Sequence, residues 1–463
     1  MPAQRNINNN NKVRLTLLDN VNVCLESFGD HVMHLVFGCD TRVDVARMGR
    51  AIRLSLDLDP ILGCRLVEQG WRPYWSRWPE AELDRFQYCD LVVAADTDRQ
   101  IEMFLLQPMN CRTEPMVQAR VIRADRDVVV LNVSCVPIDG RGLLIYLERL
   151  LVIYNRLQSE PDFRPEIGTY SQRSTADLVK RFRWHDVFKL LYYGLANQWI
   201  DHGTAGNWRF PVRTTTTRLD KTFTAYQFKN HTLARIKSYR RQTGCTFNDI
   251  LLAAFYDSLQ KIIAPKSGTT CCVLNTYDLR RYEYGTGPER VANYSSFVNS
   301  NVKLERNLPF SALVGRVQSA MAARKRHLPG ITEGPFIWPV FKLLPFSWAR
   351  TLVSSLMQRR GEHIPVLTNV GIINMENLRL DGHRIPWLLP YAPLEYPPKL
   401  TVTLATVGDV VTLTLGYSRN HFDPADIEAL FRGMEAVILE NCQLVPANTA
   451  ATDSADTQNL ANV

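Results

Sequence analysis

The chain has 463 residues, of which 46% are apolar and 22% are charged, and 54 basic against 46 acidic side chains give a net charge of +8. These values are typical of globular proteins and exclude collagen-like, coiled-coil and largely disordered chains. No run of about 18 apolar residues and no apolar N-terminal segment is present, so we expect neither a membrane-spanning helix nor a secretory signal.

Composition divides the chain into five parts. Residues 1–12 are rich in asparagine, and residues 445–463 are small, polar and acidic, so we expect both to be disordered tails. Between the tails we expect an N-terminal half at 13–175, a bridge with few strands at 176–215 and a C-terminal half at 216–444.

The N-terminal half mixes strand and helix patterns. Apolar and β-branched runs predict strands at His31–Gly38, Val117–Ala124 and Asp127–Cys135, the last two joined as a hairpin. Apolar residues at helical spacing predict a helix that Thr41 opens. The segment from Leu143 to Tyr154 is apolar on nearly every side, which predicts a buried helix directly after the hairpin.

The bridge and the C-terminal half continue this mixed order. The predicted helices are Trp184–Trp199, a basic helix after residue 228, a helix from Phe247 led by the capping pattern of Thr246 and Asp249, and Pro424–Asn441. The predicted strands are Thr222–Phe228, 271–277, 297–304, 367–373, 399–405 and 410–417. Because strands and helices do not alternate regularly, a doubly wound parallel sheet is not favoured.

Charge and cysteine content limit the partners. The basic clusters are short and no aromatic residues interleave them, so we do not expect nucleic-acid binding. The positive surplus is compatible with an acidic partner such as coenzyme A or a carrier protein. Ten cysteines without a C-x-x-C pair, in a chain without an export signal, predict free thiols in the cytoplasm rather than disulfides or a zinc site.

One segment carries a motif. Ser134-Cys135-Val136-Pro137-Ile138-Asp139-Gly140 ends a predicted strand and begins the predicted buried helix. It resembles the His-His-x-x-x-Asp-Gly signature of the condensation-domain and chloramphenicol-acetyltransferase-like superfamily, which lies at the same kind of junction. Over roughly residues 15–440, further segments resemble that superfamily in the expected order: Asp59–Arg65, Thr246–Ala254, Asn275–Arg280, Thr368–Gly371 and Tyr417–Leu430.

The resemblance implies a mixed α/β fold in which two chloramphenicol-acetyltransferase-like halves form a V with a central tunnel. It implies an acyl or peptidyl thioester donor, carried by coenzyme A or by the phosphopantetheine of an acyl- or peptidyl-carrier protein. It further implies a small-molecule acceptor and no tightly bound cofactor or metal. Four residues are expected in the substrate tunnel: Asn275, Asn293, Asn369 and Gly371.

The motif departs from the superfamily pattern at both histidines, which Ser134 and Cys135 replace. A thiol, with a reference pKa of about 8.5, is a poor general base near neutral pH, although its thiolate is a strong nucleophile. Cys135 is therefore either an acyl-accepting nucleophile or part of the tunnel lining. Ser134 should point to the opposite face of the strand, where its hydroxyl bonds to the backbone or joins a distant histidine as a nucleophile.

Asp139 and Gly140 keep the superfamily pattern. The resemblance implies that Asp139 is structural and paired with an arginine, and Arg280 at the end of a predicted strand is the candidate. The alternative is a carboxylate that only caps the following helix. Gly140 is expected to permit a close backbone approach at a point where a side chain would block the tunnel.

A histidine from elsewhere could replace the missing base. His34 on the first strand and His363 before the strand at 367–373 are the candidates, because either could approach a central tunnel. His31 lies three residues from His34, which places the two on opposite faces of a strand and argues against a shared metal.

Three functions remain open. We favour a stand-alone enzyme of specialised metabolism that performs acyl transfer, condensation or cyclisation, with orientation in the tunnel supplying most of the rate. The alternative is a non-catalytic module that binds a carrier-tethered intermediate or recruits an enzyme. A third candidate is a lipid or wax-ester O-acyltransferase, for which residues 334–357 would form an apolar surface for a lipid or membrane rather than a helical flank.

Overall fold

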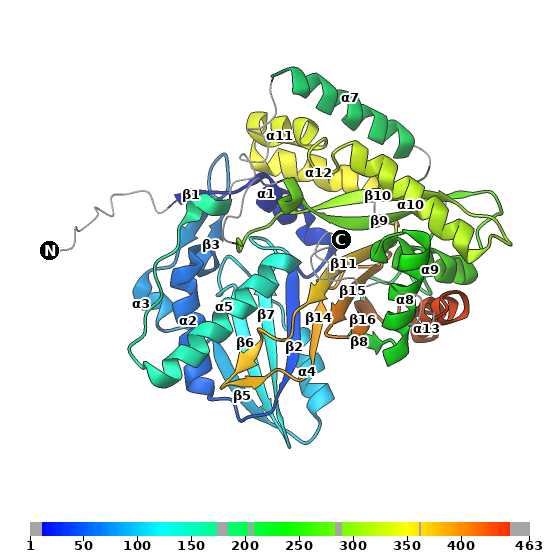
Figure 1. Ribbon diagram of the computed structural model, residues 1–463. Helices are drawn as coiled ribbons and strands as arrows, with labels where there is room; N and C mark the ends of the chain where they lie inside the picture. The colour runs from blue at the N-terminus through cyan, green and yellow to red at the C-terminus, as the bar shows by residue number, and fades with distance from the viewer. Residues whose placement is uncertain are drawn as a thin grey trace.

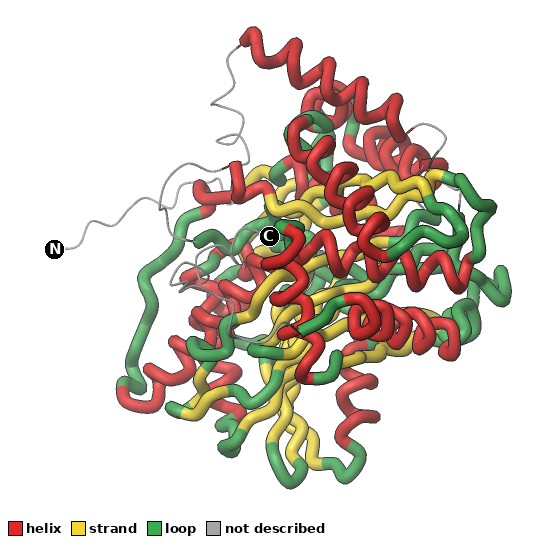
Figure 2. Tube along the Cα trace, turned by 45° about the vertical axis from the view of Figure 1, so that its right-hand side comes forward, coloured by secondary structure: helices red, strands yellow, loops and turns green. Residues whose placement is uncertain are grey.

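A computed structural model of the protein describes residues 12–173, 184–201, 204, 208–282, 289–360 and 363–444. The tails predicted at 1–12 and 445–463 lie outside these residues, except for Lys12, and so does part of the predicted bridge. Two large sheets run through the molecule, and helices cover them (Figures 1 and 2).

The N-terminal half is built on a five-stranded sheet. Its strand order is β14 (Leu388–Tyr391), β2 (Val32–Cys39), β7 (Asp127–Ser134), β6 (Val117–Arg123) and β5 (Cys89–Val93). Neighbouring strands are antiparallel except β5 and β6. One face packs against α2 (Val45–Leu58) and α5 (Gly140–Ser159), and the other packs against α4 (Thr97–Leu105).

The C-terminal half is built on a six-stranded sheet. Its strand order is β10 (Ser295–Lys303), β9 (Thr270–Asp278), β11 (Val366–Ile373), β15 (Thr401–Val407), β16 (Val410–Ser418) and β8 (Lys221–Gln227). Four helices share one apolar core with this sheet: α8 (Asn230–Thr243), α9 (Phe247–Ile263), α10 (Phe310–Arg326) and α13 (Pro424–Asn441). The two halves thus have separate main cores.

The halves nevertheless exchange elements. β14 belongs in sequence to the C-terminal half, yet it pairs with β2, where Leu388 lies opposite Phe37. In the same way α12 (Phe346–Arg360) packs against α1 (Leu17–Leu25), and Ser354 Oγ donates a hydrogen bond to the carbonyl oxygen of Cys24 at 2.8 Å. Neither half therefore completes its packing alone.

The remaining elements are short or peripheral. They are β1 (Lys12–Arg14), η1 (Glu26–Phe28), η2 (Pro60–Gly63), β3 (Cys64–Val67), β4 (Tyr74–Arg77), α3 (Glu80–Leu83), η3 (Tyr170–Arg173), α7 (Trp184–Asp201), η4 (Leu279–Tyr282), α11 (Gly334–Leu343), β12 (Arg379–Leu380) and β13 (His383–Arg384). α7 and α11 lie with α12 at the top of the view in Figure 1. Within the described part of the chain, no helix is both long and apolar enough to cross a bilayer.

The predicted mixed α/β class is confirmed, as are the strands and helices predicted from periodicity, most of them to within two or three residues at each end. The capping box of Thr246 and Asp249 is present at the start of α9. The predicted role of Thr41 is wrong, because Asp44 caps α2 by accepting a hydrogen bond from the backbone N–H of Arg47 at 3.0 Å.

Candidate functional site

The motif occupies the turn between the end of β7 and the start of α5. Two side chains from elsewhere hold the backbone of this turn. Asn22 of α1 donates from Nδ2 to the carbonyl oxygen of Cys135 at 3.0 Å, and Arg173 donates from Nη2 to that of Pro137 at 2.9 Å. Arg173 is itself paired with the buried Asp19 at 2.8 Å. These contacts hold the backbone of the motif turn in place.

Asp139 performs both of the roles considered for it. Its Oδ1 accepts the backbone N–H of Gly142 at 2.7 Å, so it caps α5. Its two oxygens also accept hydrogen bonds from the guanidinium of Arg280 at 2.8 and 3.1 Å, and Oδ2 accepts the backbone N–H of Tyr294 at 2.6 Å. The predicted ion pair is present, and the capping alternative is present with it.

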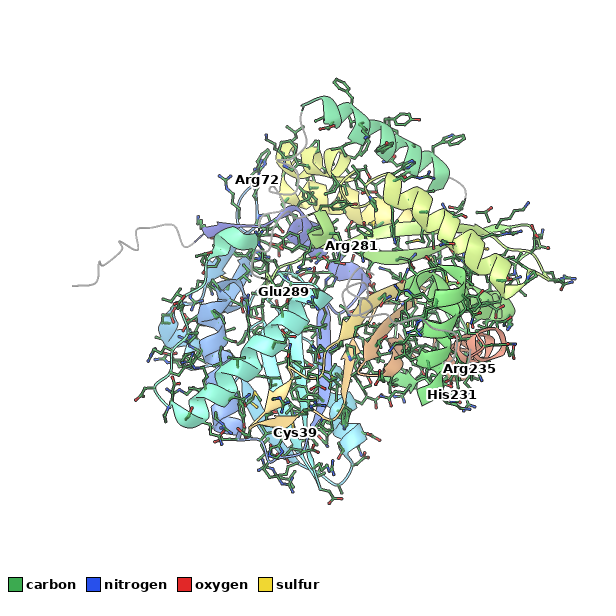
Figure 3. The ribbon with its side chains drawn as sticks, in the orientation of Figure 1. Cys39, Arg72, His231, Arg235, Arg281 and Glu289 are labelled. Atoms are coloured by element: carbon green, nitrogen blue, oxygen red, sulfur yellow. The ribbon has the colours of Figure 1, made fainter. Side chains whose placement is uncertain are left out.

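Arg280 connects this carboxylate to the C-terminal half. Its Nη2 donates to the carbonyl oxygens of Arg290 and Ala292 at 3.2 and 2.9 Å. Burial opposes its charge, but the carboxylates of Asp139 and Asp278 outweigh burial and raise the pKa of the guanidinium above its usual range. The chain beside Arg290 also reaches α5, because Glu289, which is labelled in Figure 3, pairs with Arg141.

The close backbone approach expected at Gly140 is found two residues later. A Cβ added at Gly142 would lie 3.0 Å from the carbonyl oxygen of Ala292. One added at Gly140 would meet nothing within 4 Å, because Gly140 borders open space. The close approach predicted at Gly140 is therefore wrong, and the tight contact between the halves belongs to Gly142. Gly140 does line the cavity, where the prediction that a side chain would block the passage stays a prediction.

That open space is a cavity between the two halves, with about 1110 Å³ of unoccupied volume counting the part open to solvent. The N-terminal half contributes the motif turn, the start of α5 and one face of β2. The C-terminal half contributes β9, β10, β11, β15 and the segment from Pro390 to Lys399. Most of the lining is apolar, and its apolar members include Leu25, Met33, Leu35, Ile138, Leu143, Leu144, Phe297, Val366 and Val370.

Cys135 and His31 meet at the wall of this cavity. The Sγ of Cys135 lies 3.5 Å from Nδ1 of His31, and the backbone N–H of Cys135 donates to the carbonyl oxygen of His31 at 2.9 Å. Both side chains are half-buried and line the cavity. An imidazole therefore stands beside the motif, but it comes from the chain just before β2 instead of from the motif itself.

The thiol of Cys135 is in an unfavourable place for a thiolate. Burial raises the pKa of Cys135 well above its usual range, and the carboxylate of Glu395 adds to this effect. Glu395 also lines the cavity, where it pairs with Lys399 at 3.1 Å. At neutral pH the sulfur is a protonated, weakly polar group in the wall.

Ser134 and His34 are turned away from the cavity. Ser134 is buried, and its hydroxyl accepts the backbone N–H of Val136 at 3.4 Å. His34 is also buried, with Nδ1 hydrogen-bonded to Oδ1 of Asn132 at 2.8 Å and its ring edge-on to Phe223. Burial lowers the pKa of His34 to about 4. The expectation that His34 approaches the cavity is wrong, because alternation along β2 points Met33 and Leu35 there instead.

His363 and three of the four expected tunnel residues also lie off the cavity lining. His363 is in the turn before β11. Asn275 is buried, and its Nδ2 donates a hydrogen bond to Oγ of Ser300 at 3.0 Å. Nδ2 of Asn369 donates to Oδ1 of Asn248, also at 3.0 Å.

Gly371 lies at a register shift in β11 with a φ of 86°, and is not at the cavity either. Asn293 does line the cavity, as expected from the resemblance. The hydroxyls of Thr276 and Thr368, one residue along from Asn275 and Asn369, face it as a hydrogen-bonded pair at 2.9 Å. Within the described residues, no group of three or more His, Cys, Asp or Glu side chains could hold a metal ion.

Solved structures share this architecture. The first condensation domain of the calcium-dependent antibiotic synthetase, in complex with a substrate analogue, aligns with a TM-score of 0.69 at 13% identity, covering 93% of this chain and 97% of that chain. The chain has the condensation-domain fold. The cyclization-docking bidomain of EpoB from Sorangium cellulosum aligns with a TM-score of 0.64 at 15% identity, covering 92% of this chain and 85% of that chain.

A third structure with the condensation-domain fold, the X-domain from teicoplanin biosynthesis, has a TM-score of 0.61 at 15% identity, with 96% of this chain and 98% of that chain covered. No family model and no curated protein matches the chain. The superfamily resemblance drawn from the motif is therefore supported at the level of the fold, which is compatible with more than one activity.

The sequence did not single out His31 as a site residue. Its position follows from the pairing of β2 with β7, which puts Val32 opposite Ser134 and so brings the preceding residue to Cys135. The two strands are about 100 residues apart in the chain, and no local pattern gives their register. The only available signal was that His31 and His34 must face opposite sides of the strand.

Proposed function

We propose that the protein is an enzyme of natural product biosynthesis that transfers an acyl or peptidyl group from a thioester to a small-molecule acceptor. Coenzyme A or the phosphopantetheine arm of a carrier protein would carry the donor. The observation that carries this proposal is the largely apolar cavity between the halves, which the motif turn lines. Apolar walls can bind an acyl chain, while the polar side chains of Cys135 and His31 can contact the reacting thioester carbonyl.

Orientation in the cavity supplies most of the rate in this proposal. A thioester carbonyl held beside an acceptor reacts as if the acceptor were highly concentrated, and effective molarities of about 10⁵ M or more are reached in well-oriented systems. Cys135 then serves as wall and contact partner. The raised pKa of its thiol supports this role over that of an acyl-accepting nucleophile.

A lipid acceptor is the second candidate, favoured by the exposed apolar side chains of α11 and α12. Trp338 is 52% exposed, Leu343 70% and Trp348 67%. Large aromatic side chains in water are the kind of surface that a lipid phase covers. A lipid acceptor would leave the chemistry in the cavity unchanged and would alter only where the acceptor comes from.

The test combines turnover with intact-protein mass spectrometry. The protein is incubated with a panel of acyl-coenzyme A and acyl-pantetheine thioesters, first alone and then with amine, alcohol and long-chain alcohol acceptors. We expect acylated acceptor without a stable adduct on the protein. Cys135→Phe should abolish transfer by filling the cavity beside His31, whereas Cys135→Ser should lower the rate by less than about tenfold.

Three results would change the proposal. An acyl adduct on Cys135 that goes on to product would make the thiol a nucleophile. Preference for long-chain alcohols would select the lipid acceptor. Tight binding of the thioesters without turnover in any combination would select a non-catalytic, carrier-binding module.

A further inference from the structure

His31 is the one imidazole that lines the described cavity, and the proposed function has so far given it no role. It is not part of the motif, and its φ of 53° places it in the left-handed region that non-glycine residues seldom occupy. A residue is kept in such a conformation only where the surrounding structure determines it, and such residues cluster at active sites.

The chain before His31 is held from the C-terminal half. The backbone N–H of Asp30 donates to the carbonyl oxygen of Leu394 at 2.9 Å, and that of Tyr396 donates to the carbonyl oxygen of Phe28 at 2.7 Å. Gly29, between Phe28 and Asp30, forms an isolated bridge with Glu395. A Cβ at Gly29 would lie 2.8 Å from the carbonyl oxygen of Leu394, so this approach needs glycine.

The side chain of Asp30 fixes the same segment a second time. It pairs with Lys221 at 2.8 Å and accepts a hydrogen bond from the hydroxyl of Tyr396 at 2.6 Å. On the other side of His31, its carbonyl oxygen is bound by the backbone N–H of Cys135. His31 is thus clamped between the segment 394–396 and the motif, with its ring on the cavity.

We propose that His31 is the general base of the transfer, so that the imidazole missing from position 135 is supplied by the chain facing it. This inference rests on the proposed function. In the tautomer that we assign, Nδ1–H donates to Sγ of Cys135 at 3.5 Å, a distance within reach of a sulfur acceptor. Within the described part of the chain Nε2 has no hydrogen-bond partner, and its lone pair is available to substrate.

The step balances without a further reactant. Nε2 of His31 takes the proton of the acceptor N–H or O–H as that nitrogen or oxygen bonds to the thioester carbonyl carbon. When the tetrahedral intermediate collapses, the C–S bond breaks and the departing thiolate sulfur takes the proton back from the imidazolium. The products are the amide or ester and the free thiol, and His31 returns to its neutral form.

The test removes the base while keeping the backbone. His31→Asn is suited to this, because asparagine tolerates the left-handed conformation and has no basic nitrogen. With a thioester and acceptor that the parent protein converts, we expect kcat to fall about 100-fold or more. The acidic limb of the pH–rate profile should vanish with it, a change that a purely structural role would not produce. The exposed His383→Asn is the matched control and should leave both unchanged.

A rescue variant makes the test specific. The double variant His31→Asn with Cys135→His returns an imidazole to the cavity wall from the motif side. We expect its kcat to be at least about tenfold higher than that of His31→Asn, and the acidic limb of its pH–rate profile to return. If the melting temperature shows that His31→Asn misfolds, His31→Gly is used in its place, because glycine adopts the left-handed backbone conformation without strain.

The outcomes separate the two proposals. Full activity of a folded His31→Asn, or of His31→Gly, overturns the role of His31 and leaves the transfer function standing. A loss that comes with an unchanged pH profile and without rescue also overturns it, in favour of a structural role. Absence of turnover by the parent with every donor and acceptor overturns the proposed function itself, and the base with it.

Discussion

Two histidines lie on opposite sides of the β2–β7 pair, His34 within β2 and His31 just before it, and they differ in burial and in contacts. On the face toward α4, His34 is buried, packed against Phe223 and hydrogen-bonded to Asn132. On the cavity side, His31 is half-buried and has a left-handed backbone, and its Nδ1 lies 3.5 Å from the thiol of Cys135. The same side chain thus serves packing at one position and is poised for chemistry three residues away, and burial with hydrogen bonding decides which.

The largest effect is expected where the cavity side is tied to the C-terminal half. Asp139→Ala removes a helix cap and the more buried of the two carboxylates that pair with Arg280, and leaves that charge only with the partly exposed Asp278 at 3.2 Å. We therefore expect a loss of about 3–5 kcal/mol in the free energy of unfolding. Chemical denaturation measures it, and Asp125→Ala in the exposed hairpin turn is the control. A variant with the stability of the parent would mean that the halves are held together elsewhere.

The next effect is the pH dependence of stability that buried His34 produces. The pKa of His34 is about 4 in the folded protein and about 6.5 in an unfolded chain, so the unfolded state binds the proton first as pH falls. This group should cost roughly 3 kcal/mol of stability between pH 6.5 and pH 4, and nothing above pH 6.5. In His34→Gln that part of the acid dependence should disappear, whereas His383→Gln should keep it. Equal slopes for parent and His34→Gln would contradict the assignment.

A smaller effect should follow from removing the partner of His34. Asn132 bridges Nδ1 of His34 and the carbonyl oxygen of Phe104, to which its Nδ2 donates at 2.9 Å. Asn132→Ala leaves both groups buried and unpaired, and we expect a loss of about 1–3 kcal/mol. Thermal unfolding compares it with Asn374→Ala, whose side chain is exposed. If Asn132→Ala loses less stability than the control, water must reach the His34 side of the sheet and replace the lost hydrogen bonds.

The smallest effect concerns the contact of His31. Cys135→Ser keeps a hydrogen-bond acceptor for Nδ1–H of His31, but the oxygen lies farther from Nδ1 than the sulfur does. The variant therefore weakens one hydrogen bond, which contributes about 1 kcal/mol. We expect the transfer rate to fall by less than about tenfold. A loss of rate as large as that of His31→Asn would mean that the sulfur of Cys135 takes part in the chemistry and is not only a part of the cavity wall.

Local patterns predicted the elements because the information is local. The period of apolar residues gave α9 and α13, and the capping box of Thr246 and Asp249 fixed where α9 begins. The motif located the junction of β7 and α5, and the resemblance supplied the pairing of Asp139 with Arg280. These features depend on spacing within a dozen residues or on a known pattern.

The face of the first strand that meets the cavity could not be predicted, since it depends on partners far away in the chain. Alternation showed that His31 and His34 diverge, but only the register of β2 with β7 and the position of the C-terminal half decide which one faces the cavity. The same reason accounts for Asn275 and Asn369. Their strands were predicted, but it is the neighbouring Thr276 and Thr368 that line the cavity.

β14 has a consequence for how the chain folds as it is made. β2 is complete after residue 39, but one of its edges stays open until residues 388–391 emerge from the ribosome. At a synthesis rate of about 5–20 residues per second, an unpaired strand edge is exposed for tens of seconds. Open edges template pairing with other chains. A nascent N-terminal half is therefore the species most in need of a chaperone. When expressed alone it should aggregate, because its sheet edge is open and its apolar core lacks the residues that the C-terminal half adds, such as Leu388.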